Sequence, residues 1–292
     1  MTALPVSLSA QLPVFAVLAA AVMHAAWNAM VKVSGDRVAA MARIDFWALL
    51  LALAATPFVA FPPAEIWAYL LPSLAVVTLY RVLLIAAYNR GDLSQVYPLM
   101  RGSAPAIVAL LAAAVAGEQL SVPGYTGVAL VSAGILTLVS WSTLDAHQYR
   151  VVGLALATGV SIACYTLIDS LGVRAGGDVL MYVVWLEVLE HLPLPLYLLA
   201  TRRESFRALV LGGWKAGVMG GATMIGAYGL VLWAVSLAAI AQVAALRETS
   251  VIIAALIGHF LFREPFGSKR ILASILVAGG ILLLQSGGTR PG

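Results

Sequence analysis

Residues 101–118 read RGSAPAIVALLAAAVAGE, and residues 247–264 read RETSVIIAALIGHFLFRE. Each stretch begins with an arginine, continues through apolar residues and ends in a glutamate. The two stretches start 146 positions apart, and the same shift places Gly134 on Gly280. A slightly different shift, of 138, lays HAAWNAMVK on IACYTLIDS and so aligns Trp27 with Tyr165. A similarity that recurs in order along the chain predicts two related halves.

The composition predicts a membrane protein. Of the 292 residues, 62% are hydrophobic and 10% are charged, whereas a soluble domain carries about 25% charged residues. A helix crosses a bilayer with about 20 apolar residues. Ten stretches meet this requirement, at residues 12–33, 39–61, 66–88, 94–116, 123–141, 151–171, 179–200, 209–235, 238–262 and 269–286.

The fold class expected from this pattern is an all-α polytopic membrane protein of ten transmembrane helices. The short connections leave no room for a soluble enzyme domain or a nucleic-acid-binding surface. The one cysteine, Cys164, excludes an intrachain disulfide and offers no metal cluster. We therefore expect no cofactor, no metal and no nucleic-acid partner, and a chain that contacts the lipid bilayer and a small-molecule substrate as a monomer or weak dimer.

The repeat divides the chain into a five-helix half at 1–146 and a second half at 147–292. Because five is odd, the second half enters the membrane in the opposite orientation. Basic residues support this topology, because the odd-numbered loops carry eleven, whereas the even-numbered loops and the C-terminal tail together carry two, Arg174 and Arg290. The eleven are Lys32, Arg37, Arg43, Arg90, Arg150, Arg202, Arg203, Arg207, Arg263, Lys269 and Arg270. The positive-inside rule then places the odd loops in the cytoplasm and both termini outside. Inverted repeats around a midplane site are a transporter architecture.

The segment AAYNRGDLSQVYPLMRGSAPAIVALLAAAVAGEQLSVPGYTGVALVSAGILTLVS, residues 86–140, resembles the signature of the drug/metabolite transporter superfamily, of the EamA type. The residues that carry the resemblance are Gly91, Ser94, Pro98, Pro105, Gly117, Glu118, Gly127 and Gly134. The second copy departs from this pattern, with Ala244 in place of Pro98, Val251 in place of Pro105 and Arg263 in place of the glycine. Similar proteins include bacterial inner-membrane exporters of amino acids, such as the YddG-like exporters.

The resemblance implies a central cavity lined by the first, third and fourth helices of each half. On the first helix, His24, Trp27 and Asn28 share one face by their spacing. They form either a helix-packing patch or a substrate-facing wall, and the second is favoured by Tyr165 and Asp169 on the matching helix. The other aromatic candidates for the cavity wall are Tyr80, Tyr97, Tyr228 and Trp233.

Buried arginines are the costliest feature of the sequence, since an arginine at the bilayer centre costs roughly 2.5–3.5 kcal/mol. Arg81 and Arg101 lie at similar distances from one cytoplasmic loop, which predicts a shared hydrated cavity. Arg247, the mate of Arg101, adjoins Glu248, and adjacent helical residues do not face each other, so we expect Arg247 to pair elsewhere. Either these arginines pair with acids such as Asp169 and hold the two halves of the chain together, or they bind an anionic group of the substrate.

Ionisable residues also cluster on the seventh helix, where Glu187, Glu190 and His191 share a face just before Pro193. With Glu248, these are candidates for ion or proton coupling, because histidine and buried carboxyls titrate near neutral pH. The simpler interpretation is a polar seam that stabilises a proline-broken helix. Glu118 and Glu264 end matching helices, and we interpret them as structural.

We therefore expect a secondary active transporter that exports small metabolites, in particular amino acids, across the bacterial inner membrane by alternating access. An alternative within transport is a carrier of drugs or of nucleotide-sugar or phosphorylated cargo. A different class, an intramembrane enzyme, is disfavoured because no nucleophile or metal motif is present, and we name no catalytic residue.

Overall fold

The computed structural model describes residues 6–34, 37–91, 93–139, 146–201, 203–262 and 267–286, and all their long elements are helices. The first half contains α1 (Val6–Val33), α2 (Arg37–Ala55), the short 3₁₀ helix η1 (Thr56–Phe58), α3 (Ala64–Tyr88), α4 (Leu93–Val115) and α5 (Val122–Leu136). The second half contains α6 (Ala146–Gly176), α7 (Val179–His191), α8 (Pro193–Thr201), α9 (Arg203–Leu211), α10 (Trp214–Val235), α11 (Ile240–Arg247), α12 (Thr249–Phe262) and α13 (Ser268–Ser286).

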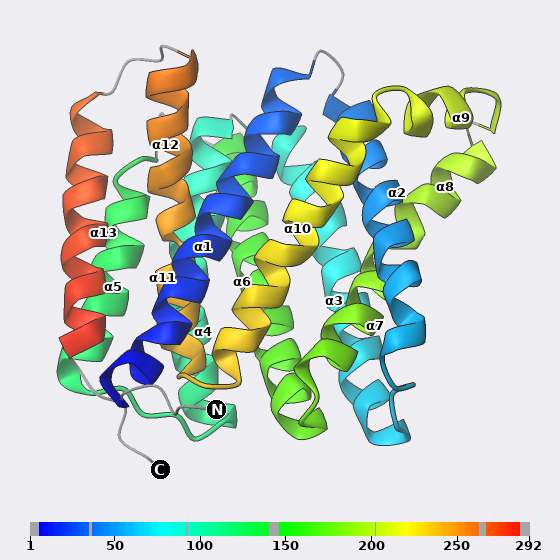
Figure 1. Ribbon diagram of the computed structural model, residues 1–292. Helices are drawn as coiled ribbons and strands as arrows, with labels where there is room; N and C mark the ends of the chain where they lie inside the picture. The colour runs from blue at the N-terminus through cyan, green and yellow to red at the C-terminus, as the bar shows by residue number, and fades with distance from the viewer. Residues whose placement is uncertain are drawn as a thin grey trace.

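The long helices stand side by side, with their connections gathered at two opposite ends (Figure 1). The pair α5 and α13 forms one edge, and α2 lies at the opposite edge with α7 and α8 (Figure 1). Between them, α3 and α4 pack on α6, while α1 and α2 pack on α10. The short helix α9 lies across the upper end in Figure 1.

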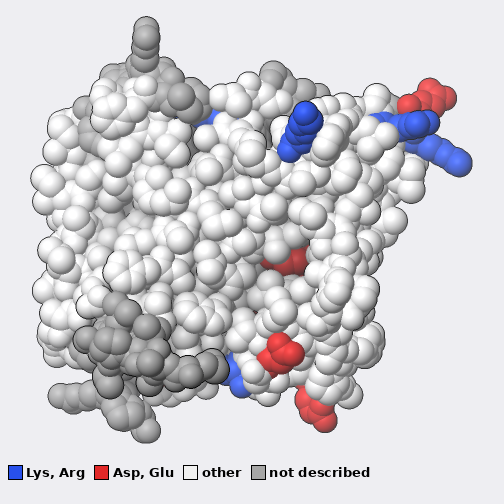
Figure 2. Space-filling model, viewed as in Figure 1, with Lys and Arg blue, Asp and Glu red and all other residues white. Residues whose placement is uncertain are grey.

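The described helices suit a bilayer. Seven are long and apolar enough to cross it, at Gln11–Val33, Ala39–Phe58, Ala64–Tyr88, Gln95–Val115, Ala146–Gly176, Val179–Thr201 and Trp214–Val235. Two further apolar helices are shorter. On the face drawn in Figure 2, charged side chains gather at the upper and lower ends, and the band between them is uncharged apart from an acidic side chain in a hollow. Large apolar side chains such as Leu79, Leu110 and Phe260 are exposed. The chain is therefore a multi-pass membrane protein.

Three of the predicted single helices are interrupted in the structure. The helix expected at 179–200 is divided into α7 and α8, because Pro193 lacks the N–H that would continue the ladder. The helix expected at 238–262 is divided at Glu248 into α11 and α12. The helix expected at 209–235 begins at Trp214, after Gly213 with φ of 72°, and its first residues belong to α9 instead.

Other predicted boundaries were also wrong by several residues. The helix expected at 39–61 ends at Ala55 and passes into η1. The helix expected at 151–171 extends over Ala146–Gly176, and the one expected at 123–141 ends at Leu136. Glu264, and the predicted loop or tail residues Arg202, Arg263 and Arg290, lie outside the described residues.

The edge pair α5 and α13 is held by close glycine contacts. A Cβ at Gly280 would lie 2.7 Å from the carbonyl oxygen of Gly127 and 2.8 Å from Val131, and a Cβ at Gly134 would lie 3.1 Å from Val277. Small residues let membrane helices approach closely enough for dense packing. The contact between these two helices therefore requires glycine.

Glu118 ties the start of α11 to the rest of the protein. Its Oε1 atom lies 2.7 Å from Nη1 of Arg174, and its Oε2 atom accepts a hydrogen bond from the backbone N–H of Ile240 at 2.8 Å. Arg174 also donates to the carbonyl oxygens of Val235 and Ala238. The structural interpretation of Glu118 is thus confirmed, and the interaction fixes the end of α11 opposite Arg247.

Replacing Gly280 with alanine should lower the free energy of unfolding by about 1–3 kcal/mol, because a backbone carbonyl cannot yield to the new methyl group. SDS titration of the purified protein in mixed micelles measures this change. Gly279→Ala is the matched control, since a Cβ at Gly279 meets nothing within 4 Å. Equal stability of the two variants would contradict the close contact.

Candidate functional site

A buried cluster of two arginines and one glutamate lies where α4 meets α11. Arg101 is 5% exposed, and its Nε atom forms an ion pair with Oε2 of Glu248 at 2.9 Å. Its Nη2 atom donates to Oγ of Ser250 at 3.1 Å. Arg247, 7% exposed, places its Nε atom 4.0 Å from Oε1 of the same glutamate. One carboxylate thus faces two guanidinium groups, and the cluster keeps an excess of one positive charge.

The pairing of these arginines agrees with the expectation for Arg247 and differs from it for Asp169. Arg247 approaches its neighbour Glu248 at 4.0 Å, and its side chain also hydrogen-bonds that of Tyr165, so it does pair elsewhere. Asp169 is not an arginine partner in the resolved ion pairs. Its oxygens instead accept hydrogen bonds from the hydroxyls of Tyr182 and Tyr228. The acidic partner that stabilises Arg101 is Glu248.

The residues expected on one face of α1 lie together near this cluster. The rings of His24 and Trp27 meet edge to face at 5.1 Å, and Nδ2 of Asn28 donates to the carbonyl oxygen of His24 at 2.7 Å. His24 lies within electrostatic range of Arg101 and Arg247. The indole N–H of Trp27 is buried and has no hydrogen-bond partner among the described residues. This face of α1 therefore offers an unused donor beside the arginines.

A row of tyrosines extends from the cluster. The rings of Tyr80 and Tyr165 lie 5.8 Å apart, and those of Tyr165 and Tyr228 lie 6.3 Å apart. Tyr97 and Tyr80 pack on the same apolar group of Met100, Ala104 and Ile162. The ring contacts resolved here do not extend to Trp233, which is half-buried further along α10.

The tyrosine row connects groups of opposite charge. Tyr165 lies within electrostatic range of Arg101 and Arg247 at one end and of Glu190 at the other. Tyr228 continues the row to the fully buried Asp169, whose carboxylate it bonds. The structure thus brings together residues of α4, α6, α10 and α11 that sequence reasoning named separately.

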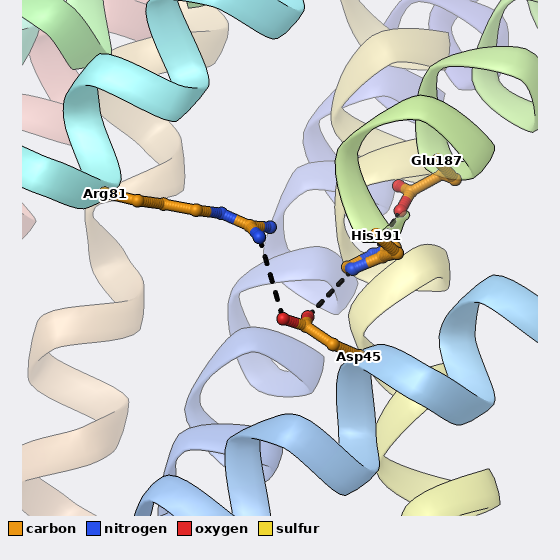
Figure 3. A network of polar contacts seen from close by, with 4 residues as sticks. All are labelled: Asp45, Arg81, Glu187 and His191. Atoms are coloured by element: carbon orange, nitrogen blue, oxygen red, sulfur yellow. Dashed lines mark hydrogen bonds and ion pairs between the residues drawn. The ribbon is translucent and has the colours of Figure 1, made fainter. Parts of the chain in front are cut away.

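A second charge network lies between α2, α3 and α7 (Figure 3). Nδ1 of His191 is 2.8 Å from Oδ1 of Asp45, and its Nε2 atom is 2.8 Å from Oε2 of Glu187. Nη1 of Arg81 lies 3.6 Å from Oδ2 of Asp45. Arg81 thus points to an acid on α2 (Figure 3), whereas Arg101 pairs with Glu248, and a hydrated cavity shared by the two arginines stays a prediction.

Asp45 is the buried acid of this network that sequence reasoning missed. It is 2% exposed and stands alone as an acid in the apolar stretch ARIDFWALLLALAA. Two signals could have identified it: a lone carboxyl in a membrane helix, and its separation of 146 positions from His191, which equals the repeat period.

The acids of α7 keep unused acceptors. Oε1 of Glu187 and Oε1 of Glu190 are buried without hydrogen-bond partners among the described residues. Glu187 also lines an otherwise apolar pocket of about 310 Å³ between α2, α7 and α10, at residues Leu51, Ala52, Ala55, Val184, Glu187, Ala222, Ile225 and Gly226. In Figure 2 an acidic side chain is visible in a hollow at mid-height.

Replacing Glu248 with glutamine should lower the free energy of unfolding by about 3–5 kcal/mol, because two buried guanidinium groups then lack a counter-charge. SDS titration measures the loss. Adding Arg101→Gln to the Glu248→Gln variant should restore part of the lost stability, because one cation is then removed together with the anion. A single variant as stable as the wild type, or a double variant less stable than Glu248→Gln, would contradict the pairing.

Comparison with known proteins gives the following. No curated protein matches the chain. A solved crystal structure has a TM-score of 0.71 to it, covering 94% of this chain and 96% of its own at 14% identity, and 28 chains of solved structures match in all. At this identity the likeness shows the fold alone.

The model of the EamA-like transporter family matches residues 150–286. This range is the second half of the chain, which carries the less faithful copy of the signature. The match confirms the resemblance to the drug/metabolite transporter superfamily. The protein is thus a multi-pass membrane protein whose residues 150–286 match the EamA-like transporter family.

Proposed function

We propose that the protein exports small zwitterionic metabolites, in particular amino acids, across the bacterial inner membrane by alternating access. Its family makes it a membrane transporter of the drug/metabolite type. The narrower proposal concerns the substrate, the two-repeat architecture and the direction of transport. It rests on the arginine–glutamate cluster and on contacts that repeat between the halves.

A ten-helix arrangement of two inverted repeats agrees with the helices observed. Seven helices are long enough to span the membrane, and α5, α13 and the interrupted pair α11–α12 supply three more crossings. The contact of Gly134 with Val277 has a counterpart in the contact of Gly280 with Val131. Under the shift of 146, each contact maps onto the other, as across a two-fold axis. This reciprocity supports the halves at 1–146 and 147–292.

The proposed orientation places the upper end of Figure 1 in the cytoplasm. The connection of α1 to α2 and helix α9 lie at that end (Figure 1), and Arg203 and Arg207 belong to α9. Loops rich in lysine and arginine stay on the cytoplasmic side. Both termini then lie in the periplasm, and a monomer or weak dimer remains our expectation.

The anionic group of the substrate fits the arginine cluster. Two buried guanidinium groups share one carboxylate there, and the Nε atom of Arg247 has no hydrogen-bond partner among the described residues. One further carboxylate would neutralise the cluster and would gain charge-assisted hydrogen bonds. This unbalanced charge is the single observation that carries the proposal. A phosphate with two negative charges exceeds the available excess of one.

The other end of the substrate fits the tyrosine row. The ammonium group lies next to the carboxylate and would face the nearest tyrosine rings, while the carboxyls of Asp169 and Glu190 further along the row would attract it only at longer range. An α-amino acid carries a cationic and an anionic group on one carbon, and its side chain would contact the rings. His24, Trp27 and Asn28 would close this site from α1, with Trp233 further along α10.

Transport in proteoliposomes tests the proposal. Vesicles loaded with an unlabelled mixture of L-amino acids should take up the same radiolabelled amino acids by exchange. Arg247→Gln should reduce this exchange at least about tenfold, since a lost charged contact costs more than about 1.4 kcal/mol. Lys215→Gln, which removes an exposed cation from α10, is the control and should exchange at the wild-type rate.

Three outcomes would contradict this assignment. One is exchange of a phosphorylated sugar or a nucleotide sugar in place of amino acids. Another is wild-type exchange by Arg247→Gln. Chemical conversion of an added compound without net flux would instead indicate an enzyme.

A further inference from the structure

We infer that Asp45, His191 and Glu187 form a proton-binding site between the two halves, and that its proton is exchanged for the transported metabolite. This inference rests on the proposed transport function and adds the coupling ion and the residues that hold it. It assigns a role to Asp45, which lies outside the proposed substrate site.

The contacts of His191 require an additional proton. Both ring nitrogens lie 2.8 Å from carboxylate oxygens, one on Asp45 and one on Glu187. A neutral imidazole has one N–H and one bare nitrogen, and a carboxylate has acceptors only. A neutral ring would therefore place a lone pair against one of the carboxylates. The three side chains fit this geometry when they hold one proton more than a neutral histidine supplies.

The charges of the network balance only with that proton. Arg81 and a protonated His191 contribute two positive charges, which match the two carboxylates of Asp45 and Glu187. Without the proton, the network has a net charge of −1 in side chains that are 2–3% exposed. An unbalanced charge in such a place is strongly unfavourable, so release of the proton requires the contacts to change.

The site joins the two halves at a symmetric position. Asp45 belongs to the first half and His191 to the second, and they lie 146 positions apart. When the shift of 146, which aligns residues 101–134 with 247–280, is extended to α2 and α7, the two-fold axis exchanges these two positions. Residues that exchange places while in contact must lie on either side of the axis. Rocking of the halves about the midplane site acts directly on this contact.

The partners of the two residues differ between the halves. Position 41, which the repeat equates with Glu187, is Met41, and position 227, which it equates with Arg81, is Ala227. In alternating access of inverted repeats, the two halves exchange conformations. Met41 then stands where the network has Glu187, and Ala227 stands where it has Arg81. The complete network therefore belongs to one of the two states. The proton is bound in that state and released in the other.

Arg81 is the exposed member of the network, and we infer that it marks the route to solvent. Arg81 is 31% exposed, whereas Asp45 is 2% exposed. On the other side, Glu187 borders the apolar pocket between α2, α7 and α10. The proton therefore enters and leaves past Arg81.

The ionisable groups that face the site from the elements packed around it are Asp45 on α2, Arg81 on α3, Asp169 on α6, Tyr228 on α10, and Tyr182, Glu187 and Glu190 on α7.

The proton can be observed directly in the purified full-length protein. We expect ¹⁵N spectra of histidine-labelled protein in detergent at neutral pH to show both ring nitrogens of His191 protonated. The chain has four histidines, so loss of a signal in His191→Gln identifies it. In Asp45→Asn, one ring nitrogen should lose its proton. A neutral His191 ring in the wild type, or an unchanged ring in Asp45→Asn, would overturn the site.

Coupling is measured as a ratio in proteoliposomes, using radiolabelled L-amino acids as the probe. The numerator is uptake driven by an interior more acidic than the bath, and the denominator is amino-acid exchange at equal pH. We expect Asp45→Asn and His191→Gln to lower this ratio at least tenfold. His147→Gln, which alters an exposed histidine at the start of α6, should keep the wild-type ratio.

The outcomes separate the coupling from the transport function. A proportional fall of both rates in Asp45→Asn, with the ratio unchanged, would show a structural contact only and overturn the inference. A ratio of one in the wild type, which means that the acidic interior does not drive uptake, would also overturn the inference. Absence of amino-acid exchange in the wild type would reject the proposed substrate, and the ¹⁵N spectra would still decide whether the proton is bound.

Discussion

The cost of placing charge inside an apolar protein governs this structure. Arg101 and Arg247 lie almost fully buried in a chain of which 62% is hydrophobic. A lone guanidinium at this depth is unfavourable, and Glu248 supplies the counter-charge for both. The interruption between α11 and α12 falls at Glu248 itself, so the residue that carries the counter-charge also separates the two helices. At the other end of α11, Glu118 accepts from its first N–H. The helix that carries Arg247 is thus fixed at both ends by acids.

The two charge networks differ in how completely they are balanced. Around Glu248, two cations face one anion, and a further anion is needed. Around His191, two carboxylates face Arg81 and the histidine (Figure 3), and a proton is needed. In the proposed cycle the metabolite supplies the first charge and the solvent supplies the second. A transporter that needs an anion at one network and a proton at the other can link the movement of its substrate to a proton gradient through one motion of its halves.

The sequence predicted the helical membrane fold, because apolar length and charge content are local properties. It also placed Arg101 and Arg247 at equivalent positions of the proposed repeat, and the structure brings the two arginines to one glutamate. It failed at Glu248, where no proline or glycine marks the break between α11 and α12. It failed at Asp45 because the packing of α2 against α7 cannot be read from either helix alone. The partners of Asp169 were missed for the same reason.

The central claim is that the excess charge of the arginine pair receives the carboxylate of an amino acid. The most direct measurement compares thermal stabilisation of the purified protein by each L-amino acid with that by its amide, which lacks the negative charge. The account predicts that at least one amino acid raises the unfolding temperature, that its amide does not, and that Arg247→Gln abolishes the effect. Equal stabilisation by acid and amide, or stabilisation by a phosphorylated sugar alone, would contradict it.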